Sequence, residues 1–175
     1  MQSLEDLPSW PLKELVDRIG STDAAPGGGA ACGVVIALAA ACALKAVVMT
    51  LKHHPDDPEL TAGAERLRHI AGDALNGAAE DALVFKGLIA AYQLPATLPA
   101  EAEIHHAAVR QSASSAVEVG LRLKGLAIEV KAMMEELQHR IAANMVSDVR
   151  TALALASAAE LIQVDNIEGH RRTAG

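Results

Sequence analysis

Residues 29–52 read GAACGVVIALAAACALKAVVMTLK, an apolar run with one internal charge, Lys45. Alanine and leucine favour the helical backbone, and in a helix of this sequence apolar side chains point in every direction. Such a helix needs neighbours on all sides, so we predict that it lies at the centre of the fold. The next residues, HHPDDP at 53–58, are typical of a loop and end the helix.

Four other segments are predicted to be helical, because their apolar residues recur every three or four positions. They lie at about residues 11–19, 59–92, 100–138 and 144–167. The glycine-rich segment STDAAPGGG at 21–29 is expected to be a loop, and EGHRRTAG at 168–175 a polar tail. No stretch shows the alternation that is typical of a strand.

The composition supports an all-helical protein. The chain has 175 residues and a mass of 18.2 kDa, with 51% hydrophobic and only 2% aromatic residues. This length is typical of one domain, and so few aromatic side chains argue against sandwiches and barrels. We therefore predict an all-α fold, a bundle of about five long helices in a single domain over residues 1–175. Helices that are apolar all round also favour a homo-oligomer.

The charge balance disfavours one class of partner. Fifteen basic and 22 acidic residues give a formal net charge of −7. A nucleic-acid-binding protein needs a basic face to neutralise phosphates. We therefore expect no nucleic-acid partner.

The two cysteines and the central apolar run bear on the compartment. Cys32 and Cys42 are ten residues apart in the predicted central helix, a rise of about 15 Å that no disulfide spans. The N-terminal residues are polar and do not resemble a signal peptide. Residues 30–51 are long enough to cross a bilayer, but Lys45 would cost about 2.5–3.5 kcal/mol there. We predict a cytoplasmic protein with no membrane partner; a membrane-anchored interaction protein is the less favoured alternative.

A glycine-rich helix start is the most specific chemical feature. Gly27, Gly28 and Gly29 lead directly into the central helix. Glycines let a ligand approach the backbone closely, and the unpaired N–H groups at a helix N-terminus favour an anion. The segment matches neither the dinucleotide fingerprint nor the P-loop. A helix start that only permits close packing is the alternative.

Two aspartates are candidates for acid/base chemistry. Asp81 shares a helix face with Phe85 and Leu88, and Asp148 precedes an almost uncharged run. A carboxylate among apolar side chains has a raised pKa and serves as a general acid or base. The alternatives are a partly solvated face for Asp81 and a dipole-stabilising position in the first helical turn for Asp148.

Three further polar residues are candidates for ligand binding. Lys45 is the lone charge within the central run, and Asn144 and Asn166 bracket the last predicted helix. A lysine that reaches the rim of the fold and asparagines that cap a helix are the alternatives. The seven histidines form no zinc-binding pattern, so no metal site is expected.

Taken together, these residues resemble the cyclodeaminase/cyclohydrolase family. This family includes the cyclodeaminase domain of formiminotransferase-cyclodeaminase and the bacterial methenyltetrahydrofolate cyclohydrolases. The resemblance rests on PGGGAA at 26–31, on DALVF at 81–85 with AYQLP at 91–95, and on NMVSD at 144–148 with Asn166 following. The order and spacing agree over about residues 9–168.

The resemblance implies an all-helical homodimer whose substrate is a tetrahydrofolate derivative. Its members act on a C–N bond of the formimino or methenyl group, as lyases or hydrolases. Asp81 and Asp148 are then the implied catalytic carboxylates. The implied ligand-binding residues are Gly27, Gly28, Gly29, Lys45, Phe85, Asn144, Ser147 and Asn166.

Three features depart from the family pattern. Val48 stands where the family usually has asparagine, Gly120 stands where it has proline, and the chain ends soon after Asn166. Each difference is expected to remove a ligand contact or reshape the pocket. Two alternatives therefore stay open: a diverged member acting on another imine or amidine, and a non-catalytic dimer that binds a small molecule.

Overall fold

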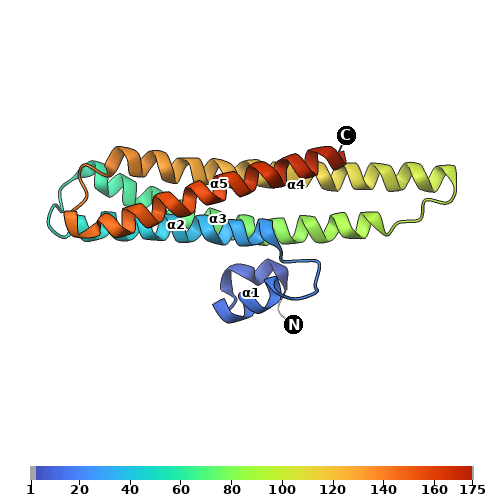
Figure 1. The fold of residues 1–175 in the computed structure, drawn as a ribbon, viewed down its shortest axis with the longest axis horizontal. Helices are drawn as coiled ribbons and strands as arrows, with labels where there is room; N and C mark the ends of the chain where they lie inside the picture. The colour runs from blue at the N-terminus through green and yellow to red at the C-terminus, as the bar shows by residue number, and fades with distance from the viewer. Residues whose placement is uncertain (1–2, 175) are drawn as a thin grey trace.

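The computed structural model describes residues 3–174 and is helical throughout, with no strand in that range (Figure 1). A 3₁₀ helix, η1, and a short helix, α1, precede four long helices, and a second 3₁₀ turn, η2, leads into the last of these. The elements in chain order are η1 (Leu4–Ser9), α1 (Leu12–Ile19), α2 (Gly28–Leu51), α3 (Pro58–Tyr92), α4 (Pro99–Leu137), η2 (Ala143–Met145) and α5 (Val146–Ala174). The predicted all-α bundle is confirmed.

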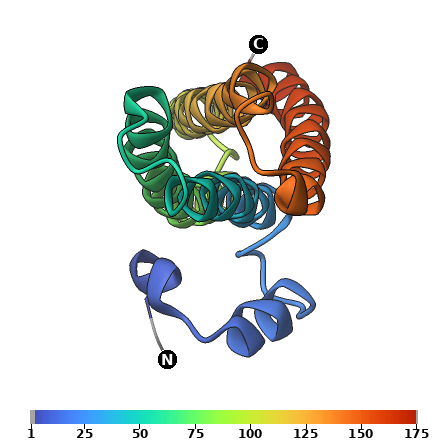
Figure 2. The ribbon, with the colours of Figure 1, turned by 90° about the vertical axis from the view of Figure 1, so that its left-hand side faces the viewer.

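The four long helices run alternately in opposite directions around a common axis (Figure 2). Around this ring α2 contacts α3, α3 contacts α4, α4 contacts α5, and α5 contacts α2. Short loops join them, as expected for antiparallel neighbours. The far ends of α3 and α4 extend well beyond the start of α2 (Figure 1).

Helix α2 contributes more buried residues to the main apolar cluster than any other helix, but one side of it is exposed, so it is not surrounded on all sides as predicted. Ile36, Ala40 and Val47 are fully buried in the main apolar cluster, together with residues of α3, α4 and α5. Small residues let α3 approach closely, since a Cβ added at Gly33 would lie 2.8 Å from the Cβ of Ala78. By length and composition α2 is also long and apolar enough to cross a membrane. Within its most apolar stretch of 18 residues, 44% is buried inside the protein.

The N-terminal segment forms a small unit beside the bundle (Figure 2). Leu7, Trp10 and Leu15 pack with residues of α2 and α3 in a separate apolar cluster. The Arg18 guanidinium lies 4.4 Å from the centre of the Trp10 ring, a favourable cation–π geometry.

The two ends of the chain hold helical segments that were not predicted, although α1 itself agrees with its predicted bounds to one residue. The chain already forms η1 before Trp10, a 3₁₀ turn that the apolar periodicity does not reveal. Helix α5 continues to Ala174, so the predicted polar tail is wrong. Glu168 and Arg172 form an i,i+4 ion pair there, and Ala174 packs against the cluster around Leu88. Tertiary packing therefore stabilises helical turns that look polar in the sequence.

Candidate active site

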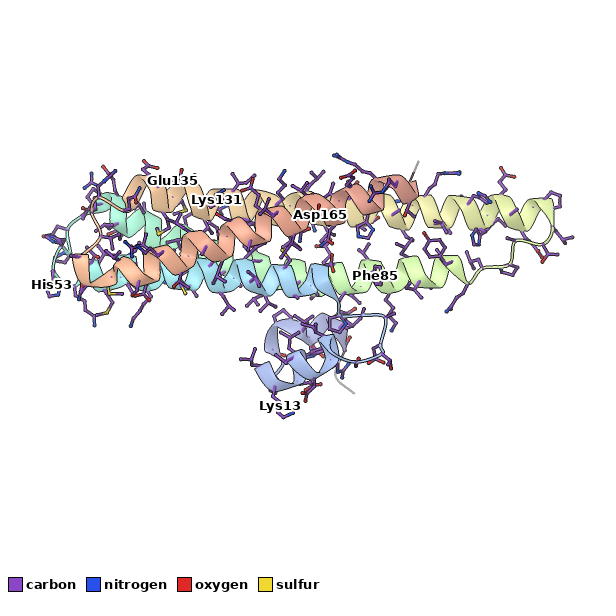
Figure 3. The ribbon with its side chains drawn as sticks, in the orientation of Figure 1. Lys13, His53, Phe85, Lys131, Glu135 and Asp165 are labelled. Atoms are coloured by element: carbon purple, nitrogen blue, oxygen red, sulfur yellow. The ribbon has the colours of Figure 1, made fainter. Side chains whose placement is uncertain are left out.

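A small pocket lies where α2 begins, opposite the middle of α3 and the last turns of α5. Its volume is about 170 Å³. Figure 3 shows Phe85 at this level of α3, while His53, Lys131 and Glu135 lie towards the opposite end of the bundle. The lining residues are Gly27, Gly28, Gly29, Asp81, Phe85, Asn166 and His170. Of the sequence-predicted site residues, the structure brings together the three glycines, Asp81, Phe85 and Asn166.

The Asp81 carboxylate is seated on the N-terminus of α2. A Cβ at Gly29 would overlap this carboxylate, so only glycine leaves room for it. The backbone N–H of Ala30, within the first turn, donates a hydrogen bond to the carboxylate. Helix α2 has no side-chain cap and no acidic residue of its own in that turn. An aspartate of α3 therefore provides the anion that the start of α2 favours.

The environment of Asp81 tunes its acidity. Burial raises the pKa of Asp81 to about 6, although the hydrogen bond from Ala30 opposes this rise. A carboxyl with a pKa near neutrality changes its protonation state readily under physiological conditions, as a general acid or base requires.

His170 is a pocket residue that the sequence analysis missed. Its ring lies 6.5 Å from that of Phe85, centre to centre, in a tilted arrangement. Burial lowers the pKa of His170 below its usual value, which favours the neutral imidazole near pH 7. The spacing of four residues from Asn166 was the available signal, because it places both on one face of a helix. The prediction of a polar tail at residues 168–175 leaves His170 outside the helix and so hides this relation.

The remaining predicted site residues lie elsewhere in the protomer. Asp148 sits in the first turn of α5 beside Cys42, whose pKa is raised by burial and further by the Asp148 charge. Cys42 is 13 positions after Gly29 on the same helix, which corresponds to about 20 Å. Within one chain, the structure therefore places Asp148 far from the pocket at Asp81.

Lys45, Asn144 and Ser147 share this distant location. All three side chains are exposed, and none lines the pocket at Asp81. Lys45 lies on the outer side of α2, consistent with the alternative of a lysine at the rim. Asn144 belongs to η2 rather than to α5.

The two internal departures from the family pattern differ in their distance from the pocket. Val48 packs against the main core towards the end of α2, far from Gly29. Gly120 lies near the site: a Cβ there would come within 2.8 Å of Ile167 and 3.3 Å of the amide oxygen of Gln163. A glycine at this position thus lets α4 approach α5 next to Asn166.

Among the described residues, no group of three or more histidine, cysteine, aspartate or glutamate side chains is arranged to hold a metal ion. The pocket instead combines one carboxyl, one imidazole, one amide and one aromatic ring within an all-helical bundle. This defines a small-molecule site suited to acid/base chemistry.

Comparison with known sequences identifies the family. The formiminotransferase-cyclodeaminase family model matches residues 11–168, and the chain belongs to this family. The formimidoyltransferase-cyclodeaminases of Mus musculus and Rattus norvegicus are each 30% identical to it over 145 residues. These matches cover 81% of this chain and 27% of each relative, so the chain spans about a quarter of their length.

Comparison with solved structures confirms the fold. The crystal structure of formiminotetrahydrofolate cyclodeaminase from Thermotoga maritima matches with a TM-score of 0.81. The match covers 93% of this chain and 79% of that chain, at 22% sequence identity. The helical arrangement is therefore shared with a known member of the cyclodeaminase class.

Proposed function

We propose that this protein is a cyclodeaminase that acts on the formimino group of a tetrahydrofolate. The observation that carries the proposal is the Asp81 carboxyl, held against Gly29 at the start of α2 with a pKa of about 6. Membership of the formiminotransferase-cyclodeaminase family supports the substrate class.

The proposed reaction closes a ring and releases ammonia. The N10 amine of the folate attacks the carbon of the protonated formimino group on N5, so that an N10–C bond forms. Asp81 accepts the proton from N10 and delivers it to the exocyclic nitrogen. This nitrogen then leaves as ammonia with its bonding electron pair, and the N5 lone pair restores the amidinium. The cationic substrate gives a cationic methenyl product, so charge and atoms balance.

Other pocket residues support this chemistry through their positions. The ionised Asp81 carboxylate stabilises the cationic amidinium. Phe85 offers an aromatic surface for the pteridine ring, and Asn166 offers an amide that donates and accepts hydrogen bonds. Neutral His170 is a second group able to exchange a proton. The same residues would also serve the cyclohydrolase reaction, in which water adds to the methenyl carbon and a ring C–N bond breaks as its nitrogen accepts a proton.

We also propose that the protein works as a cytoplasmic homodimer. Leu12 on α1, Leu38 on α2 and Leu161 on α5 are 70%, 51% and 69% exposed, respectively. Exposed apolar side chains mark an interface where they lie side by side in one patch. A second copy of the chain would cover them. It would also bury the outer surface of α2, a helix that is apolar on all sides.

A direct test follows the near-ultraviolet absorbance of the methenyl product. Purified protein is mixed with 5-formiminotetrahydrofolate, and separately with methenyltetrahydrofolate. We expect the protein to accelerate product formation from the first compound. Asp81→Asn should lower kcat by at least about 100-fold, as removal of a general acid/base commonly does.

The outcomes separate the alternatives. Acceleration of methenyl decay alone would identify a cyclohydrolase instead. A folded protein that turns over neither compound would overturn the proposal and favour another imine or amidine substrate, or a binding role. Full activity in Asp81→Asn would overturn the role of this carboxyl.

A further inference from the structure

We propose that a second pocket, between Tyr92 of α3, His105 and Arg110 of α4 and Thr173 of α5, binds the carboxylate-bearing end of the substrate. Its volume is about 310 Å³. The proposal rests on the proposed function, because it assigns the amidine end of the same molecule to Asp81. We call it the distal pocket; its lining is completed by His106 and Val109.

The pocket at Asp81 is too small for a whole folate. Its volume of about 170 Å³ lies below the roughly 300–1,000 Å³ of most small-molecule sites. A folate comprises a pteridine, a benzoyl ring and a glutamate. The reacting portion fills the pocket, so the glutamate end must lie along a neighbouring surface.

The start of α2 is not free to receive the glutamate. Its first turn already donates a hydrogen bond, from Ala30, to the Asp81 carboxylate. A second anion at this helix terminus would face the ionised form of Asp81 at close range, and like charges repel strongly in a partly buried site. The anionic end of the substrate therefore requires another positive region.

The helices lead from the first pocket to the distal pocket. Asp81, Phe85 and Tyr92 follow one face of α3, with spacings of four and seven residues, and Tyr92 lines the distal pocket. On α5, His170 lines the first pocket and Thr173 the second. The 11 positions from Asp81 to Tyr92 correspond to about 16 Å, a span suited to an extended benzoylglutamate.

The charge of its lining distinguishes the distal pocket. It contains Arg110 and two histidines and no carboxylate. Each of the other four pockets compared is lined by at least one carboxylate. Their acidic lining residues are Asp81 in the first pocket, Asp23 beside α1, Asp73, Glu80 and Glu129 in one α3–α4 groove, and Glu59, Glu129 and Glu136 in the other. In a chain of net charge −7, this makes the distal pocket a favourable place for an anion. The pocket beside α1 also holds Arg18 and Lys86, but it contains Asp23, and Arg18 is already paired with Glu14.

The individual side chains are available for this role. Arg110 is exposed and takes part in none of the ion pairs found within residues 3–174. Its guanidinium suits bidentate binding of a carboxylate. His105 Nδ1 donates to the carbonyl of Leu94 over 3.1 Å, which fixes the ring at the rim of the pocket. Glu101 on the same hairpin is engaged with the backbone N–H groups of Thr97 and Leu98.

The test compares two substrates in Arg110→Gln. One is 5-formiminotetrahydrofolate, and the other is the same compound with glutamate replaced by an uncharged amide. We expect Arg110→Gln to raise KM for the folate about tenfold, the equivalent of one charge-assisted hydrogen bond, with kcat unchanged. KM for the amide should not change. Arg68→Gln, an exposed arginine towards the other end of α3, is the matched control and should behave as wild type.

A binding measurement separates this proposal from the proposed function. p-Aminobenzoylglutamate is titrated into the full chain, and the histidine ring C–H signals are followed by NMR. Binding that Arg110→Gln weakens would support the distal pocket even if no folate is turned over. Turnover with the same KM in wild type and Arg110→Gln would overturn the distal pocket alone. If the protein shows no turnover and also no binding that depends on Arg110, both the proposed function and the distal pocket are overturned.

Discussion

At the scale of single residues, Gly29 and Asp81 form one unit. The aspartate comes from the middle of α3 and the glycine from the first turn of α2, and neither position can change without affecting the other. The sequence predicts a role for each residue separately. It predicts that the glycine belongs to an anion-binding helix start and that the aspartate is an acid among apolar residues. It did not show that the anion bound at the helix start is the aspartate itself.

We predict that Gly29→Ala lowers kcat at least tenfold. The added methyl group would overlap the Asp81 carboxylate, which must then leave its place against the helix N-terminus. The measurement is steady-state kinetics together with circular dichroism of the variant. Gly87→Ala is the control, because Gly87 lies on α3 outside the pocket and has no atom within 4 Å of an added Cβ. Equal activity of both variants would contradict the prediction.

We predict that Asp81→Asn stabilises the folded protein at neutral pH. The pKa of Asp81 is raised from 3.8 to about 6 on folding, so the unfolded chain ionises more easily than the folded one. The resulting cost is absent below pH 3.8, grows as the pH rises through this interval, and is complete above about pH 6. Asparagine cannot ionise, so we expect a gain of about 1–3 kcal/mol at pH 8.

Urea denaturation of both proteins at pH 4 and pH 8 measures this effect. The gain should be much smaller at pH 4, where the wild-type carboxyl is protonated in the folded state and only partly ionised in the unfolded chain. A gain that is the same at both pH values would mean that charge burial is not its cause. Stabilisation accompanied by loss of activity would show a catalytic group maintained at the expense of stability.

At the scale of helices, close approach between α2 and α3 depends on small residues. Gly33 faces Ala74 and Ala78, and the turn of α3 that follows carries Asp81. The small residues of α2 were evident in the sequence, whereas the partner residues on α3 were not. This contact therefore links the packing of the bundle to the position of the Asp81 carboxyl.

We predict opposite effects for the same substitution at two helical glycines. Gly33→Ala would place its Cβ 2.8 Å from the Cβ of Ala78 and 2.9 Å from the Ala74 carbonyl oxygen, and should destabilise the protein by about 1–3 kcal/mol. Gly72→Ala has no atom within 4 Å of its Cβ and should stabilise it by about 0.5–1 kcal/mol. Urea midpoints measure both, and destabilisation by Gly72→Ala would show that helix propensity is not the controlling factor.

At the scale of the whole molecule, the exposed apolar residues on α1, α2 and α5 remain to be covered. Helix α2 is apolar all round, and α3, α4 and α5 cover only part of it. The distance between Asp81 and Asp148 within one chain also leaves NMVSD at 144–148 without a role in the first pocket. A dimer would cover the outer surface of α2, which carries both Leu38 and Lys45.

We predict that Leu38→Lys converts the dimer into a monomer, because it places a charge in the apolar interface. Size-exclusion chromatography with light scattering measures the mass. Leu121→Lys on α4 is the matched control, since Leu121 is 46% exposed and Leu38 is 51% exposed. A wild-type protein that elutes as a monomer would contradict the homodimer, and dissociation by Leu121→Lys instead would place the interface on α4.

The sequence alone determined the helical class, the large contribution of α2 to the core and the family. These follow from local properties: helix propensity, apolar periodicity and short motifs are all set by neighbouring residues. Of the site residues that it predicts, Gly29, Asp81, Phe85 and Asn166 line one pocket in the structure. Its errors concern the end of α5, where contacts with α3 and α4 stabilise turns that are polar in sequence.

Which of these residues meet depends on how the helices pack against one another. Spacing along a helix shows which residues share a face, but the face that a neighbouring helix presents depends on how the two helices are offset along the bundle. That offset results from the packing of the whole core, including the close contact at Gly33. It brings His170 to Asp81 and keeps Asp148 about 20 Å away along α2, because α2 and α5 run in opposite directions and only the end of α5 reaches the start of α2.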